Sequence, residues 1–269
     1  MDSISPYLDL ANHHANATVE DIQKICADVV EYGFHAVFVN PCYIRLAKET
    51  LAERFPEFKD PQFRESSQQS KDPQFRESSG PAPKVGTVIS FPLGGDTLAA
   101  KRAAANEAAM LGADELDVVP NIATFLRGDA GGFLSEMTAI VESARMAGKT
   151  VIVKFIIEPG FFDVAKSNTF PGIKAPPIPG NDDNVTGIEE NKLAEAALLV
   201  QKAGADYVKI GSGMGPRSPT LTDYTIVRNA VGPDMKIKVA GGITTYEQAK
   251  PFIDAGVTRI GTSHAVEIL

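Results

Sequence analysis

Three lysines lie within short apolar segments of this 269-residue chain, although a lysine is rarely buried without a partner. They are Lys154, Lys209 and Lys238, and two aspartates, Asp9 and Asp117, occupy comparable segments. Each lysine alone could extend its ammonium to the surface or pair with Asp117. Convergence of all five would instead indicate chemistry, because ionisable groups with shifted pKa values cluster at functional sites.

The chemistry open to these residues is nucleophilic catalysis by an amine. A free lysine has a pKa of about 10.4, so it is protonated at neutral pH. Burial and a neighbouring cation both lower that pKa, and Lys238 would be the cation beside Lys209. Neutral Lys209 could attack a carbonyl and form a Schiff base, which accepts electrons when a C–C bond breaks. Asp117, through water or Lys238, would relay the proton.

Glycine-rich segments follow the last three predicted strands and could bind a phosphate. Backbone amides and hydroxyl groups bind phosphate well, and barrel proteins often hold one beside their last strands. The alternative is that these glycines only form turns. The candidate phosphate-binding residues are Ser212, Gly213, Gly241, Gly242, Gly261 and Ser263, with Gly211 beside them.

Apolar or β-branched runs alternate with Ala-rich helical stretches along the chain. We predict strands over 7–10, 36–40, 84–90, 115–119, 150–157, 207–210, 236–239 and 259–261. We predict helices over 19–32, 43–54, 96–111, 132–146, 188–203, 222–231 and 246–255. Eight strands alternating with helices predict one (β/α)8 TIM barrel spanning residues 1–269, with the candidate residues at one end. A doubly wound sheet is disfavoured, because no G-x-G-x-x-G follows the first strand.

Local signals support several helix ends. Thr18 followed by Asp21 resembles a capping box at the start of the first helix. Gly112, Gly204 and Gly256 follow predicted helices, where glycine commonly ends a helix in the left-handed conformation.

Two long loops interrupt this alternation. KDPQFRESS occurs at 59–67 and again at 71–79, and we interpret 59–80 as a surface-loop insertion, with docking of a protein partner as the alternative. The prolines and Asn/Asp/Gly residues of 167–187 predict a loop without regular structure.

Composition excludes several classes of function. The formal charge of −8 argues against binding nucleic acid. The two cysteines form no CxxC, and the four histidines, His13, His14, His35 and His264, lack metal-ligand spacing, so we expect no metal site. Neither a secretory signal nor an 18-residue apolar run is present, so we expect a cytoplasmic protein that does not contact membranes.

Taken in order, seven segments resemble the deoxyribose-phosphate aldolases. These are VFVNP (37–41), VGTVISFPLG (85–94), GADELDVVPNI (112–122), VKFIIEPG (153–160), AGADYVKIGSG (203–213), KVAGGITT (238–245) and RIGTS (259–263). The resemblance implies a class I aldolase on a barrel, without metal or cofactor. Such an enzyme interconverts 2-deoxyribose 5-phosphate with glyceraldehyde 3-phosphate and acetaldehyde, and the family often forms dimers.

The resemblance also assigns roles to individual residues. The Schiff-base lysine corresponds to Lys209, the second lysine to Lys238 and the relay aspartate to Asp117. Asp9 and Lys154 correspond to supporting residues near the pocket. The family's phosphate site, which would hold a small phosphorylated sugar, corresponds to Gly213, Gly241, Gly242, Gly261 and Ser263.

Some positions differ from the family pattern. Ala11 stands in place of a threonine, Thr244 in place of a basic residue, and His264 in place of a small residue at the phosphate site. Two hypotheses follow. The chain is an active aldolase, or it is a weak or inactive aldolase-like barrel that acts as a binding protein.

Overall fold

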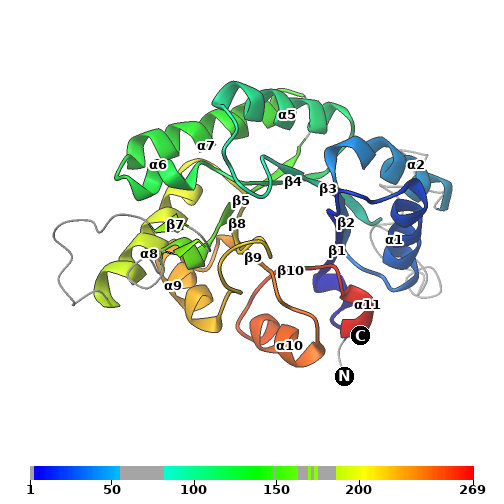
Figure 1. Cartoon of the computed structure of the whole chain (residues 1–269). Helices are drawn as coiled ribbons and strands as arrows, with labels where there is room; N and C mark the ends of the chain where they lie inside the picture. Colours follow the sequence, from blue (N-terminus) through cyan, green and yellow to red (C-terminus); the bar gives the residue numbers. More distant parts are fainter. Residues whose placement is uncertain (1–2, 55–81, 148–149, 163–168, 171–172, 175–185) are drawn as a thin grey trace.

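The computed structural model of the chain describes residues 3–54, 82–147, 150–162, 169–170, 173–174 and 186–269. Within them, eight parallel strands form a closed barrel in the order β1-β10-β9-β8-β5-β4-β3-β2, as Figure 1 shows. This order confirms the TIM barrel and not the doubly wound sheet. The barrel strands are β1 (Leu8–Asn12), β2 (Ala36–Val39), β3 (Lys84–Ile89), β4 (Glu115–Val118), β5 (Ile152–Ile157), β8 (Tyr207–Ile210), β9 (Lys236–Ala240) and β10 (Arg259–Thr262).

Helices surround the barrel and connect its consecutive strands (Figure 1). They are α1 (Val19–Glu31), α2 (Ile44–Arg54), α5 (Leu98–Met110), α6 (Ile122–Leu126), α7 (Ala130–Arg145), α8 (Thr186–Lys202), α9 (Leu221–Val231), α10 (Tyr246–Asp254) and α11 (Ala265–Ile268). Short 3-10 helices span Ser5–Tyr7, Pro41–Tyr43 and Pro159–Phe161. Among the described residues, every helix is too short or too polar to span a lipid bilayer.

The predicted strands agree with the observed ones to within two residues at either end. β1, β9 and β10 extend past their predicted ends, because the neighbouring strand continues to pair there; Asn12, for example, lies opposite Val39. Helix α6 was missed, since five residues are too few to show a periodic pattern. Its N-cap is Asn121, whose Oδ1 accepts a hydrogen bond from Thr124 N at 3.2 Å.

Of the two loops predicted from the sequence, 59–80 and 167–187, the structure tests only the second. The duplicated segment at 59–80 lies outside the described residues. The prediction of no regular structure over 167–187 is wrong in part. It contains an antiparallel pair, β6 (Thr169–Phe170) with β7 (Ile173–Lys174), and helix α8 begins at Thr186.

Local capping follows the sequence signals. Thr18 accepts a hydrogen bond from Asp21 N at 3.2 Å, and Asp21 Oδ2 accepts one from Thr18 N at 2.8 Å, which completes the predicted capping box. Gly112 has φ +102° directly after α5, a backbone conformation that side chains disfavour. The Ala113 amide can therefore bond back to the Ala108 carbonyl at 3.0 Å and end the helix.

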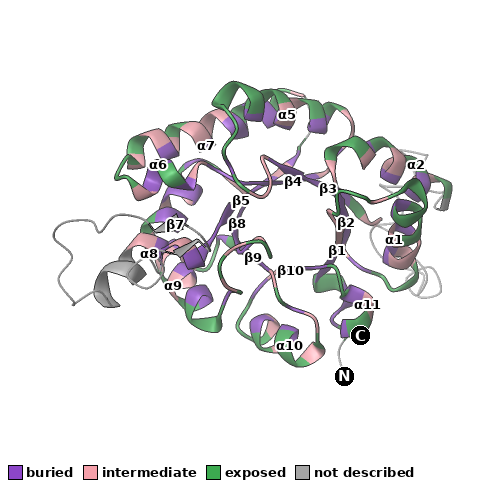
Figure 2. Cartoon of the chain, in the orientation of Figure 1, coloured by how far each residue is buried: buried purple, intermediate pink, exposed green. Residues whose placement is uncertain are grey.

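Alternation along the strands separates an apolar shell from a charged barrel interior. On β4, Leu116 and Val118 belong to the hydrophobic core between strands and helices, whereas Glu115 and Asp117 are buried on the opposite face. Figure 2 shows this pattern as buried strands encircled by helices whose outer faces are exposed. The apolar shell thus supports a ring of strands that holds ionisable side chains inside the barrel.

Candidate active site

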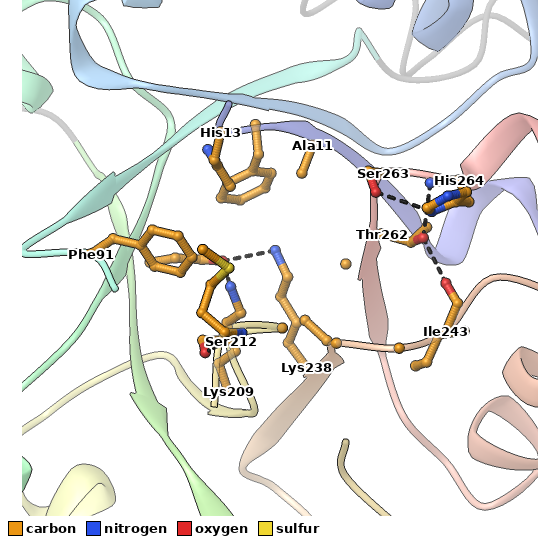
Figure 3. Close-up of a pocket in the computed structure, with 18 of the residues that line it drawn as sticks. Ala11, His13, Phe91, Lys209, Ser212, Lys238, Ile243, Thr262, Ser263 and His264 are labelled. Carbon is orange, nitrogen blue, oxygen red and sulfur yellow. Dashed lines mark hydrogen bonds and ion pairs between the residues drawn. The ribbon is translucent and has the colours of Figure 1, made fainter. Parts of the chain in front are cut away.

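A cavity of about 340 Å³ opens where the barrel strands end (Figure 3). The three residues predicted to be catalytic, Lys209, Lys238 and Asp117, all line it. The rings of Phe38 and Phe91 supply apolar wall. All six residues predicted to bind phosphate also line the cavity, namely Ser212, Gly213, Gly241, Gly242, Gly261 and Ser263.

Strand register places the two cavity lysines side by side. Lys209 on β8 lies opposite Lys238 on β9, and both side chains are buried. Lys209 Nζ lies 2.7 Å from Asp117 Oδ2, and Lys238 Nζ lies 2.9 Å from the same oxygen. Two amines therefore share one carboxylate oxygen of Asp117.

A second group of charged residues, Lys154 and Glu115, lies deeper in the barrel and adjoins Asp117. Lys154 Nζ lies 3.0 Å from Asp117 Oδ1 and also bonds Glu115. Lys154 lies opposite Tyr207, two residues before Lys209, so its amine sits further from the cavity mouth and does not line the cavity. Both oxygens of Asp117 are thus held by lysines.

Asp9 supports the other cavity lysine. It is fully buried, and its Oδ2 lies 2.7 Å from Lys238 Nζ. Neither Asp9 oxygen accepts a hydrogen bond of normal geometry from the described residues, so the contact is an ion pair. Like Lys154, Asp9 lies outside the cavity lining. The residues predicted to be supporting therefore contact the catalytic candidates and not the cavity.

The surroundings of Lys209 favour its neutral amine over its ammonium. The pKa of Lys209 is lowered to about 8, because burial and the charge of Lys238 lower it by more than Asp117 raises it. At pH 7 about one Lys209 in ten is then the neutral amine, against about one in three thousand for an ordinary lysine. Burial alone would raise the pKa of Asp117, but Lys154, Lys209 and Lys238 hold it well below its usual range.

At the glycine-rich end, Ser212 is held by a carboxylate. Its amide and its hydroxyl both donate to Glu158 Oε2, at 3.0 and 2.6 Å. Register explains the contact, because Ile157 lies opposite Ile210 and the two chains therefore leave the barrel side by side. Burial raises the pKa of Glu158, and the bonds from Ser212 partly offset that rise. A phosphate would compete with Glu158 for Ser212.

The rest of this end is built from backbone and small side chains. Gly242 has φ +73°, and a Cβ there would lie 2.1 Å from Ser218 Oγ, so only glycine fits. Ser263 Oγ lies 3.0 Å from His264 Nδ1. The His264 ring is exposed and lies at the edge of the cavity without filling it.

Comparison with known proteins assigns the family. The model of the DeoC/LacD family of aldolases matches residues 6–261. The chain belongs to the DeoC/LacD aldolase family. A deoxyribose-phosphate aldolase of Thermococcus gammatolerans is 36% identical over 266 residues, covering 99% of this chain and 95% of the relative. One of Caldicellulosiruptor saccharolyticus is 34% identical, covering 99% and 96%.

Solved structures agree with this assignment. A structure described as QR15, an aldolase, has a TM-score of 0.73 and 26% identity, covering all of this chain and 95% of that one. A tetrameric deoxyribose phosphate aldolase from Aeropyrum pernix shares the fold, with a TM-score of 0.72, 24% identity and coverage of 98% and 88%. The resemblance predicted from the seven sequence segments is therefore confirmed.

One side chain in the cavity of this DeoC/LacD aldolase escaped the sequence reasoning. His13 was considered only as a metal ligand, yet it follows β1 and lines the cavity with Lys209. Its place just beyond a strand end was the available signal, because side chains at the carboxyl ends of barrel strands face the active site.

Proposed function

We propose that the chain is a class I aldolase that reversibly cleaves 2-deoxyribose 5-phosphate to glyceraldehyde 3-phosphate and acetaldehyde through a Schiff base on Lys209. The observation that carries this proposal is the buried Lys209 amine, which lines the cavity, contacts Asp117 at 2.7 Å and has its pKa lowered to about 8. Its relatives support the substrate, because those at 32 to 36% identity are named deoxyribose-phosphate aldolases.

The reaction begins at the C1 aldehyde of the open-chain sugar. The neutral amine of Lys209 adds to C1, water leaves, and an iminium forms. The electron pair of the C2–C3 bond then moves toward the iminium nitrogen and leaves an enamine on Lys209. The C3 hydroxyl loses its proton and becomes the aldehyde of glyceraldehyde 3-phosphate.

Asp117 and Lys238 move the proton. Asp117, through water or through Lys238, accepts the proton of the C3 hydroxyl and returns it to C2 of the enamine. Water then hydrolyses the resulting iminium, which releases acetaldehyde and restores Lys209. Lys154 and Asp9 act as positioning residues, because they fix Asp117 and Lys238 by the contacts of 3.0 and 2.7 Å.

The phosphate of the sugar would bind at the glycine-rich end of the cavity. Close approach of an anion requires backbone without side chains, and Gly213, Gly241 and Gly242 supply it. Gly261 and Ser263 complete this end, whereas Ser212 would first have to release Glu158. A homodimer, a protein partner at 59–80 and a cytoplasmic location stay predictions.

Turnover of 2-deoxyribose 5-phosphate tests this proposal. The purified chain is expected to release acetaldehyde, detected by its reduction with a coupled alcohol dehydrogenase. Lys209→Met should abolish release, whereas Lys202→Met, at an exposed lysine on α8, should retain it. A wild-type chain without turnover would favour the alternative, a barrel that only binds.

A further inference from the structure

Most polar side chains around the cavity already have a partner. Asp117 is shared among lysines, and Ser212 donates to Glu158. At the opposite side, Ser263 contacts His264, and Thr262 Oγ1 donates to the Ile243 carbonyl at 2.7 Å. These groups are engaged before any substrate arrives, so a polar side chain without a partner is informative.

His13 is such a side chain. It is half-buried just after β1 and lines the same cavity as Lys209. Its ring packs against Phe91 with centroids 5.3 Å apart. Its Nδ1 is buried and has no hydrogen-bond partner among the described residues. A buried polar atom without a partner is costly, so its retention in a cavity wall indicates a partner supplied by the ligand.

The setting of His13 keeps its ring neutral. Its pKa is lowered to about 3, because burial and the charges of Lys209 and Lys238 lower it by more than Asp117 raises it. A neutral imidazole carries one N–H and can donate a hydrogen bond without adding a positive charge. That property suits a site that already holds the charge of Lys238 and gains the charge of a lysine iminium, since a further cation would be repelled.

His13 lies across the cavity from Lys209. In the barrel order, β1 is separated from β8 by β10 and β9. Figure 3 shows His13 near the top of the cavity and Lys209 below it, with Lys238 to one side. A substrate bonded to Lys209 through C1 would extend into the space between the two side chains.

We propose that neutral His13 donates a hydrogen bond to the C3 oxygen of the substrate, where negative charge develops as the C2–C3 bond breaks or forms. This role rests on the proposed aldolase reaction and adds a group that polarises the acceptor aldehyde. His13 keeps its proton throughout, and the Asp117 and Lys238 pair still carries the transferred proton. A neutral histidine can stabilise such an oxygen in a barrel enzyme.

Two reactions of acetaldehyde separate this role from a structural one. Exchange of the acetaldehyde methyl protons in D₂O, followed by NMR, needs only Lys209 and the proton relay. Addition of acetaldehyde to glyceraldehyde 3-phosphate also needs the acceptor oxygen to be stabilised. His13→Phe keeps a ring against Phe91 but removes the N–H, and His13→Gln restores a donor. Lys202→Met, at the exposed lysine on α8 outside the cavity, is the control.

In His13→Phe, exchange should stay within about threefold of wild type while addition falls about 100-fold, the usual effect of removing one donor to a developing oxyanion. His13→Gln should recover part of that loss, and Lys202→Met should lose neither reaction. Equal loss of both reactions, or retention of both, in His13→Phe would overturn the role of His13. A wild-type chain that fails to exchange acetaldehyde protons would instead overturn the proposed aldolase.

Discussion

Replacing Asp117 by asparagine should make Lys209 a better nucleophile and the protein a worse enzyme. The substitution keeps the shape of the side chain but removes the negative charge 2.7 Å from Lys209 Nζ. That charge raises the pKa of Lys209, whereas burial and the charge of Lys238 lower it. With the opposing charge gone, the pKa should fall below its present value of about 8.

The size of the change follows from the distance. An opposite charge within a few ångströms typically shifts a pKa by about one to three units. A fall of one unit would already raise the neutral fraction of Lys209 at pH 7 from about one in ten to about one half. Turnover should nevertheless fall by about 100-fold or more, because the carboxylate that relays the proton is lost.

Competitive acetylation of the lysines across a range of pH measures the pKa of Lys209 directly. Peptide mass spectrometry reports the labelling of Lys209 relative to the exposed Lys202, and the midpoint of labelling gives the pKa of Lys209. Asp117→Asn should lower that midpoint, whereas Lys238→Met should raise it. Asp114→Asn, which alters an ion pair with Lys48 outside the cavity, should leave it unchanged. An unchanged or higher midpoint in Asp117→Asn would refute this account of the site.

Three further predictions concern stability. Lys154→Met leaves the buried carboxylates of Glu115 and Asp117 with one partner fewer. The free energy of unfolding, measured by urea denaturation, should therefore fall by about 3–5 kcal/mol. An unchanged midpoint of denaturation would contradict the buried ion pairs. Gly86→Ala places a Cβ 2.3 Å from the Phe38 ring, so thermal unfolding should show a cost of about 1–3 kcal/mol unless that ring moves freely. Burial raises the pKa values of Glu115 and Asp117, but their lysine partners lower them by more, so both carboxyls stay charged in the folded protein at low pH. The free energy of unfolding should therefore fall as the pH drops below about 4, because the carboxyls of the unfolded chain then take up protons. Stability that is flat from pH 6 to pH 3 would argue against that linkage.

The fold could be predicted from the sequence because the patterns that mark its strands and helices are local and repeated. Each strand is a short apolar run, and each is followed by a helix with its own start and stop, such as Thr18 before α1 and Gly112 after α5. The alternation of eight strands with helices is then compatible with only a few folds. Helix α6 and the β6–β7 pair were missed because elements of five and two residues contain little more than one period of a pattern, so no repeat can be seen in them.

Only part of the candidate site could be predicted from the sequence. Lys209, Lys238 and Asp117 stood out because charge is rare in apolar strands, and strand register then brought them together. The engagement of Ser212 by Glu158 depends on the register of β5 against β8, which a single sequence does not display. His13 was missed for a similar reason, since its burial and its missing partner arise from groups that lie far from it in the sequence.

The central claim is that Lys209 forms the Schiff base. Sodium borohydride added to the chain with 2-deoxyribose 5-phosphate or acetaldehyde reduces any iminium to a stable secondary amine, and peptide mass spectrometry locates it. We expect one stoichiometric adduct on Lys209, retained in Lys154→Met and absent from Lys209→Met. An adduct on another lysine, or none at all in the wild-type chain, would contradict it.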